Sequence, residues 1–164
     1  MVTQKTVNAE SLESMSLTHP KLRDFYKKGL GAFESIDKPH IDVPDTRLIF
    51  GSVALDKAAL QDMPDDNRWD YALDYNGQVF FIEVHPAKAS EIDTVINKVI
   101  GLSQWLSNIG SDLLSLPPID RIFYWVSSGK TKMVPSGNQI KKLVKNKVEL
   151  SGTVWRYAKL VHVK

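Results

Sequence analysis

RWDYALDYNGQVFFIEV, residues 68–84, decides the fold, because two strand-like runs flank a turn of two residues. Asn76-Gly77 is the strongest short signal for a β-hairpin. A two-residue turn fixes the strand register, and here it pairs Asp70 with Glu83 at a non-hydrogen-bonded position where Cα atoms approach to about 4.5 Å. The sequence therefore predicts a hairpin from Trp69 to Val84 with two carboxylates opposite each other on one face.

The same register places four large side chains on the other face, which we expect to pack more deeply: Tyr71, Leu73, Phe80 and Ile82. Carboxylates that face each other repel, at a cost of up to about 1 kcal/mol relative to a neutral pair. A divalent cation, Mg²⁺ or Mn²⁺, would compensate, because hard ions take carboxylate oxygens as ligands and activate water for phosphodiester hydrolysis. The alternatives are an ion pair of Asp70 with Arg68 and of Glu83 with a nearby lysine.

His85 follows Glu83 by two residues and so shares its face of the strand. An imidazole there can orient or deprotonate a water molecule, or bind the metal. We therefore include His85 with Asp70 and Glu83 as candidate catalytic residues, against the alternative of a packed or solvent-facing histidine.

Working outward from the hairpin, helical and strand-like patterns alternate. Residues 1–18 lack periodicity and predict a flexible tail, and 19–164 then form a single domain. The predicted elements are a helix from His19 to Glu34, a strand at 47–55, a helical turn at 58–64, a helix from Glu91 to Asn108 capped by Ser90, a buried strand at 121–127, a basic helix at 139–150 and a strand at 153–162. The fold class is thus α/β, a mixed sheet with a central β-hairpin flanked by helices.

Composition restricts the class of protein. The chain has 164 residues and no cysteine, which excludes disulfides and thiolate zinc sites and favours a cytoplasmic protein. No apolar run is long enough for a membrane span.

Charge is distributed unevenly along the chain. Residues 1–120 hold 11 Lys/Arg and 18 Asp/Glu, whereas residues 121–164 hold 10 Lys/Arg and one acid. A basic segment on an acidic body favours an anionic partner, nucleic acid first, because phosphate neutralisation supplies most non-specific affinity. The lysines expected to form this surface are Lys130, Lys132, Lys141, Lys142, Lys145 and Lys147. The alternative is a solvated helix face.

The element order and the two acids resemble the PD-(D/E)XK, or restriction-endonuclease-like, nuclease superfamily over residues 20–127. In that family an acid on the second core strand and a Glu-x-Lys on the third bind the metal. The resemblance implies a restriction-endonuclease-like core, with Asp70 and Glu83 as metal ligands. Glu34 is then the candidate for an acid on the first helix. The motif lysine is replaced by His85.

Three functions follow as hypotheses. The first is a metal-dependent endonuclease that hydrolyses phosphodiester bonds. The second is a catalytically inactive nuclease-like domain that binds nucleic acid or a protein partner, and the third is an unrelated α/β interaction protein. A nuclease that cuts both strands of a duplex would favour a homodimer, because one chain carries one site.

Overall fold

The computed structural model describes residues 10–129 and 133–157 of the chain. Its main element is a mixed six-stranded sheet with the strand order β1-β3-β4-β5-β6-β7. These strands are β1 (Tyr26–Lys28), β3 (Ile49–Ala54), β4 (Tyr71–Tyr75), β5 (Gln78–His85), β6 (Phe123–Ser127) and β7 (Val148–Leu150). The pairs β1–β3, β3–β4 and β4–β5 are antiparallel, whereas the pairs β5–β6 and β6–β7 are parallel. A second, two-stranded sheet pairs β2 (Ile41–Asp42) with β8 (Trp155–Arg156).

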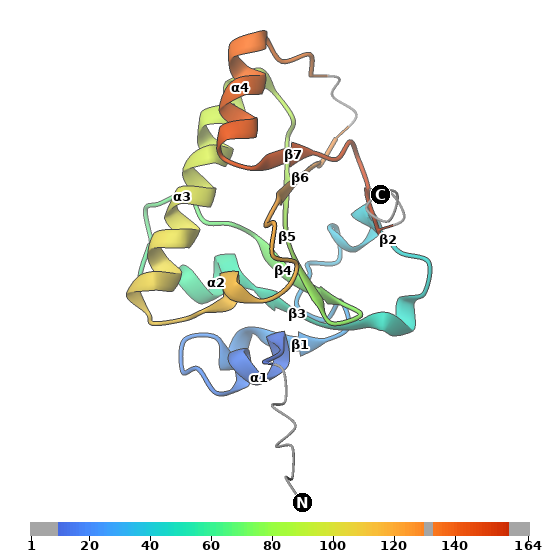
Figure 1. The fold of residues 1–164 in the computed structure, drawn as a ribbon, viewed down its shortest axis with the longest axis vertical. Coiled ribbons are helices and arrows are strands. Elements are labelled where there is room, and N and C mark those ends of the chain that lie inside the picture. The colour runs from blue at the N-terminus through green and yellow to red at the C-terminus, as the bar shows by residue number, and fades with distance from the viewer. Residues whose placement is uncertain (1–9, 130–132, 158–164) are drawn as a thin grey trace, which may run out of the picture.

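The described part of the chain contains four α-helices beside the sheet. They are α1 (Leu12–Leu17), α2 (Leu55–Ala59), α3 (Ile92–Asn108) and α4 (Gly137–Lys145). Figure 1 shows α3 and α4 on the same side of the sheet, with α4 near one end of α3. Short 3-10 turns occur at Arg23–Phe25, Lys38–His40, Thr46–Leu48, Ala89–Glu91 and Leu113–Ser115. No helix in these described ranges has the length and hydropathy to cross a bilayer.

The hairpin has the predicted register. Tyr75 pairs with Gln78, Leu73 with Phe80 and Tyr71 with Ile82. Asn76 and Gly77 have φ angles of 51° and 88°, the left-handed pair that a two-residue hairpin turn requires. The central hairpin and the mixed α/β sheet are therefore confirmed.

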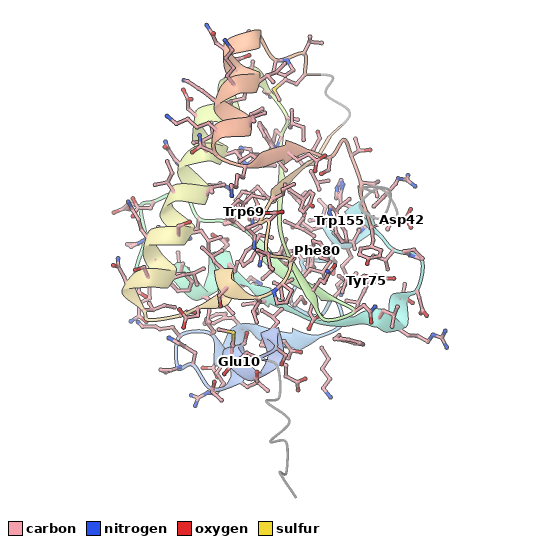
Figure 2. The ribbon with its side chains drawn as sticks, viewed as in Figure 1. Glu10, Asp42, Trp69, Tyr75, Phe80 and Trp155 are labelled. Carbon is pink, nitrogen blue, oxygen red and sulfur yellow. The ribbon has the colours of Figure 1, made fainter. Side chains whose placement is uncertain are left out.

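Both faces of the hairpin are buried along most of their length, so the expectation that one face packs more deeply is wrong. Ala72 and Phe81, on the face of the two acids, are 0% exposed, and so are Leu73 and Ile82 on the other face. Helix α3 covers the first face with an apolar stripe of Ile92, Val95, Ile96, Val99, Leu102 and Leu106. The second face contributes Tyr75 and Phe80 to a cluster of aromatic side chains that also includes Trp155, and Figure 2 shows these three close together.

The predicted helix from His19 to Glu34 is wrong. That stretch forms turns and the short strand β1, which pairs with β3. Gly29, with a φ angle of 56°, is in the left-handed region, which ends any regular element at that point. The first helix is instead α1, inside the stretch expected to be a tail. It begins with a reciprocal cap between Ser11 and Ser14, and Leu12 is 0% exposed.

Several other predicted boundaries change. The helical turn expected at 58–64 is α2, which begins at Leu55. Helix α3 begins at Ile92 with Glu91 at its N-cap, so Ser90 is not the cap. The helix predicted for 139–150 ends at Lys145, because Lys147 has a φ angle of 57° and the chain then enters β7. Of the strand predicted for 153–162, only Trp155–Arg156 form β8 within the described residues 153–157, and 158–162 lie outside the described residues.

Candidate functional site

The acids of the hairpin lie side by side, as predicted. Asp70 immediately precedes β4, and its backbone N–H donates to Glu83 Oε2 at 3.0 Å. In return, the Val84 N–H donates to Asp70 Oδ2 at 3.0 Å. The Asp70 carbonyl accepts a hydrogen bond from the Leu55 N–H at 2.9 Å. Each carboxylate is thus oriented by a backbone donor of the opposite strand, which fixes the geometry of the pair.

A lysine from α3 completes the group. Lys98 Nζ donates to Glu83 Oε1, and the two side chains are 12% and 0% exposed. Lys98 follows the buried Val95 by three residues and precedes Leu102 by four, so it lies on the face of α3 that covers the sheet. We name this group of Asp70, Glu83 and Lys98 the acid–lysine cluster.

The sequence suggests a lysine as a partner of Glu83 but does not identify which lysine. A detectable signal was present, since Lys98 interrupts the apolar stripe of α3 at a sheet-facing position. The alternative partner suggested for Asp70 is not used: the Arg68 guanidinium donates to Asp56 Oδ1 at 2.7 Å.

Burial changes the protonation of this cluster. Desolvation raises the pKa of Asp70 to about 6, against the opposing effect of Lys98 and of the Val84 N–H. Desolvation and the charge of Asp70 raise the pKa of Glu83 well above its ordinary value. The two carboxyls therefore hold a proton to a higher pH than ordinary acids do.

Lys98 keeps its proton. Desolvation lowers its pKa, but the attraction of Glu83 and Asp70 outweighs that effect, and the net direction is upward. At neutral pH Lys98 is an ammonium ion, which can stabilise negative charge and cannot act as a general base.

The surroundings of the cluster are acidic. Asp37 and Asp56 both raise the pKa of Asp70 by their charge. Asp56 is paired with Arg68, and Asp37 Oδ2 accepts a hydrogen bond from the Tyr71 hydroxyl at 2.6 Å. With both acids of the cluster ionised, one ammonium leaves a net negative charge. An additional cation is favoured there, and a phosphate group alone is not.

Of the carboxylate oxygens of Asp70 and Glu83, only some are available to bind a small hard cation. Mg²⁺ is commonly held by one or two carboxylates together with water, and Asp70 Oδ1 has no hydrogen-bond donor among the described residues. Both oxygens of Glu83 already accept hydrogen bonds. Within residues 10–129 and 133–157, no group of three or more histidine or acidic side chains is arranged to hold a metal ion. Asp70 and Glu83 would therefore be the protein ligands, with no third carboxylate.

The other two predicted site residues, Glu34 and His85, have side-chain partners outside the acid–lysine cluster. Glu34 does not lie on a helix, and its carboxylate contacts Lys57 Nζ at 2.5 Å. It does not form a three-carboxylate group with Asp70 and Glu83. His85 Nε2 lies 2.9 Å from Glu91 Oε2. His85 is thus on β5, as predicted, with a carboxylate of the turn before α3 as its side-chain partner.

The predicted basic surface is described in part. Lys130 and Lys132 lie outside the described residues, whereas Lys141, Lys142, Lys145 and Lys147 are exposed. Lys142 Nζ contacts Asp93 Oδ1 on α3 at 3.2 Å. Helix α4 also carries Ile140 and Val144, which are exposed, so its accessible surface is not purely basic.

Comparison with known proteins adds no assignment. No protein-family model, no curated protein and no solved structure matches the chain.

Proposed function

We propose that the chain is a metal-dependent phosphodiester hydrolase of the nuclease type, with the acid–lysine cluster as its active site. The observation that carries this proposal is the ammonium group of Lys98 beside two carboxylates on adjacent strands. Glu83 is buried, and Asp70 and Lys98 are partly buried beside it. Desolvating ionisable side chains costs stability that well-packed apolar residues would not, so this group favours a chemical role.

The order of elements supports a restriction-endonuclease-like core. Helix α1 and the edge strand β1 precede three consecutive antiparallel strands of the sheet, β3, β4 and β5, and α3 then leads to β6, parallel to β5. Asp70 adjoins the second of these strands and Glu83 lies on the third, the positions that the resemblance assigns to the metal-binding acids. The lysine that the family places two residues after the second acid is supplied here from α3.

The roles of the residues follow from their charges. Asp70 and Glu83 would hold one Mg²⁺ or Mn²⁺ ion, which supplies a Lewis acid and lowers the pKa of a bound water. Lys98 remains protonated and stabilises negative charge that develops at the phosphate. The acidic surroundings at Asp37 and Asp56 make phosphate approach depend on the cation.

The second candidate function is a nuclease-like domain that binds without cutting. It is favoured by one observation: Glu83 is 0% exposed and both of its oxygens have protein partners. In that case the cluster is a structural group, and a divalent ion has no place in it.

Metal titration separates these functions. We expect isothermal calorimetry of the full chain to show binding of Mn²⁺ and Mg²⁺, and D70N and E83Q to abolish it. D93N is the matched control, because Asp93 is an exposed acid on α3 with its own lysine partner. Cleavage of single- and double-stranded DNA and RNA, assayed in parallel, should require the metal and be lost in K98M.

If the parent binds neither ion at millimolar concentration and cuts none of these substrates, the enzyme proposal fails and the binding domain remains. Sedimentation velocity of the parent in the presence of duplex DNA measures whether the protein forms a homodimer, as cutting of both strands would require.

A further inference from the structure

A groove with an apolar lining lies between α4, the edge strand β7 and the segment that enters β6. Its volume is about 580 Å³. The apolar side chains that line it are Ile122, Ile140, Leu143, Val144, Val148 and Leu150. The lining contains no aromatic residue. None of the residues of the acid–lysine cluster lines it, so the groove is independent of the proposed active site.

Exposed apolar side chains concentrate around this groove. Val144 is 69% exposed and Ile140 is 48% exposed, one helical turn apart on α4. Ile122 also lines the groove and is partly exposed, and Ile119 and Val134, close to lining residues in the sequence, are almost fully exposed. Large apolar side chains that gather on one face of a protein mark an interaction site more often than scattered ones do.

The groove runs along an open sheet edge. Strand β7 is the last strand of the six-stranded sheet and pairs, among the described residues, only with β6. Every residue of β7 lines the groove. An exposed edge offers backbone donors and acceptors to an extended chain, while neighbouring pockets take its alternate side chains.

Charge determines what kind of chain fits. By helical spacing, Lys141 and Lys145 follow Ile140 and Val144 around α4 and border the apolar stripe. Lys142 lies on the opposite side of the helix, where it contacts Asp93. In the lining, Asp120 and Glu149 are balanced by Arg121 and Lys147. The excess charge beside the groove is therefore positive.

Arg121 adds a second cationic feature. It lines the groove but is only 8% exposed, and its guanidinium donates to the carbonyls of Val79 and Leu116. Its Nε has no partner among the described residues. The guanidinium carbon lies 4.8 Å from the centre of the Phe81 ring. No carboxylate neutralises this arginine in the described part of the chain, which favours an anionic group nearby.

We propose that this groove binds an extended, acidic segment of a partner protein. The segment would pair with β7, place apolar side chains against Ile140 and Val144, and place carboxylates near Lys141 and Lys145. Nucleic acid fits this face less well, because exposed aliphatic side chains lie between the lysines and the groove and no aromatic side chain is present to stack on a base.

The test is a selection from a library of random twelve-residue peptides, with the immobilised full chain as bait and V144D as the counter-selection. Affinities of the selected peptides are then measured by fluorescence anisotropy. We expect enrichment of Asp and Glu together with Leu, Ile or Val, and a loss of affinity of about tenfold in V144D. The double variant K141E/K145E should lose about fivefold, more at low salt than at high salt.

Two matched controls separate this surface from general effects. K142E reverses a charge on the far side of the same helix, and I36D changes an apolar side chain that is 80% exposed elsewhere. Both should bind the selected peptides like the parent. Circular dichroism and thermal unfolding verify that each variant is folded.

Three results would overturn the proposal. The first is no enrichment over the V144D counter-selection, or enrichment of sequences without acidic residues. The second is self-association of the parent that V144D abolishes, which makes a second copy of the chain the occupant. The third is oligonucleotide binding that K141E/K145E abolishes and V144D leaves unchanged, which assigns the face to nucleic acid.

Discussion

Replacing Lys98 by methionine tests the buried cluster directly, because the change removes the ammonium and keeps most of the side-chain volume. Glu83 is 0% exposed and then has no cation beside it. Breaking a buried ion pair by removing one partner costs about 3–5 kcal/mol. Since the Lys98 side chain retains 12% exposure, we expect the lower end, about 3 kcal/mol at pH 7. If repulsion between Asp70 and Glu83 were the dominant interaction, removing either acid would instead leave the stability unchanged or raise it slightly.

The pH dependence and a double-mutant cycle make the test specific. The loss in K98M should be smaller at pH 5 than at pH 7, because a raised pKa of Glu83 favours its neutral form as the pH falls. E83Q/K98M, with no charge left at either position, should be within about 1 kcal/mol of the parent, since replacing both partners of a buried pair is often near neutral. Urea unfolding at pH 5 and pH 7 measures the stability of the parent, K98M, E83Q and E83Q/K98M. A loss below about 1 kcal/mol in K98M at pH 7, or no coupling between the two positions, would refute the buried ion pair.

Three further predictions concern neighbouring features. Burial raises the pKa of Asp70 from 3.8 to about 6, so the folded state binds more protons than the unfolded state between these values. Stability should therefore fall by about 2 kcal/mol as the pH rises from 4 to 7. Urea unfolding should show a flatter profile in D70N, and an equally steep one would contradict the assignment. Gly51→Ala should be more destabilising than Gly77→Ala in thermal unfolding, because a Cβ at Gly51 overlaps the Tyr26 hydroxyl, whereas Gly77 has open space and needs only its φ angle of 88°. Equal losses would argue against the close approach of Tyr26. His85→Ala should cost less than about 1 kcal/mol and leave metal binding unchanged, because the His85–Glu91 pair is partly exposed. Loss of metal binding in this variant, with binding retained in K98M, would make His85 the third member of the site.

The failed helix prediction at 19–34 shows a limit of periodicity. Leu22, Tyr26 and Phe33 are buried as the pattern indicates, but Tyr26 is on a strand and Phe33 packs on the opposite side of the sheet core from Leu22. The spacing of apolar residues indicates which side chains are buried. In a stretch that contains Gly29 and Gly31, turns can bury those side chains as readily as a helix can. The expectation of a flexible tail fails at Leu12–Leu17 because α1 spans only six residues, too few to show a clear periodicity, and packs through Leu12 and Ser16.

By itself, the sequence determined the features that depend on neighbouring residues. Asn76-Gly77 sets the turn, the turn sets the register, and the register places Asp70 beside Glu83 without any knowledge of the rest of the fold. The apolar stripe of α3 and the buried strand β6 are equally local in origin.

Only the tertiary structure determined which side chain contacts these acids from the helix that covers them. Lys98 is 15 residues from Glu83 along the chain. The way α3 packs on the sheet determines that Lys98, and not His85, is the partner of the buried carboxylate. The same holds for α4, whose exposed Ile140 and Val144 become part of a groove because β7 follows and leaves its edge open. Strand pairing is set by hydrogen bonds with a fixed repeat, whereas the side chain that meets a helix across a core depends on how the whole surface packs.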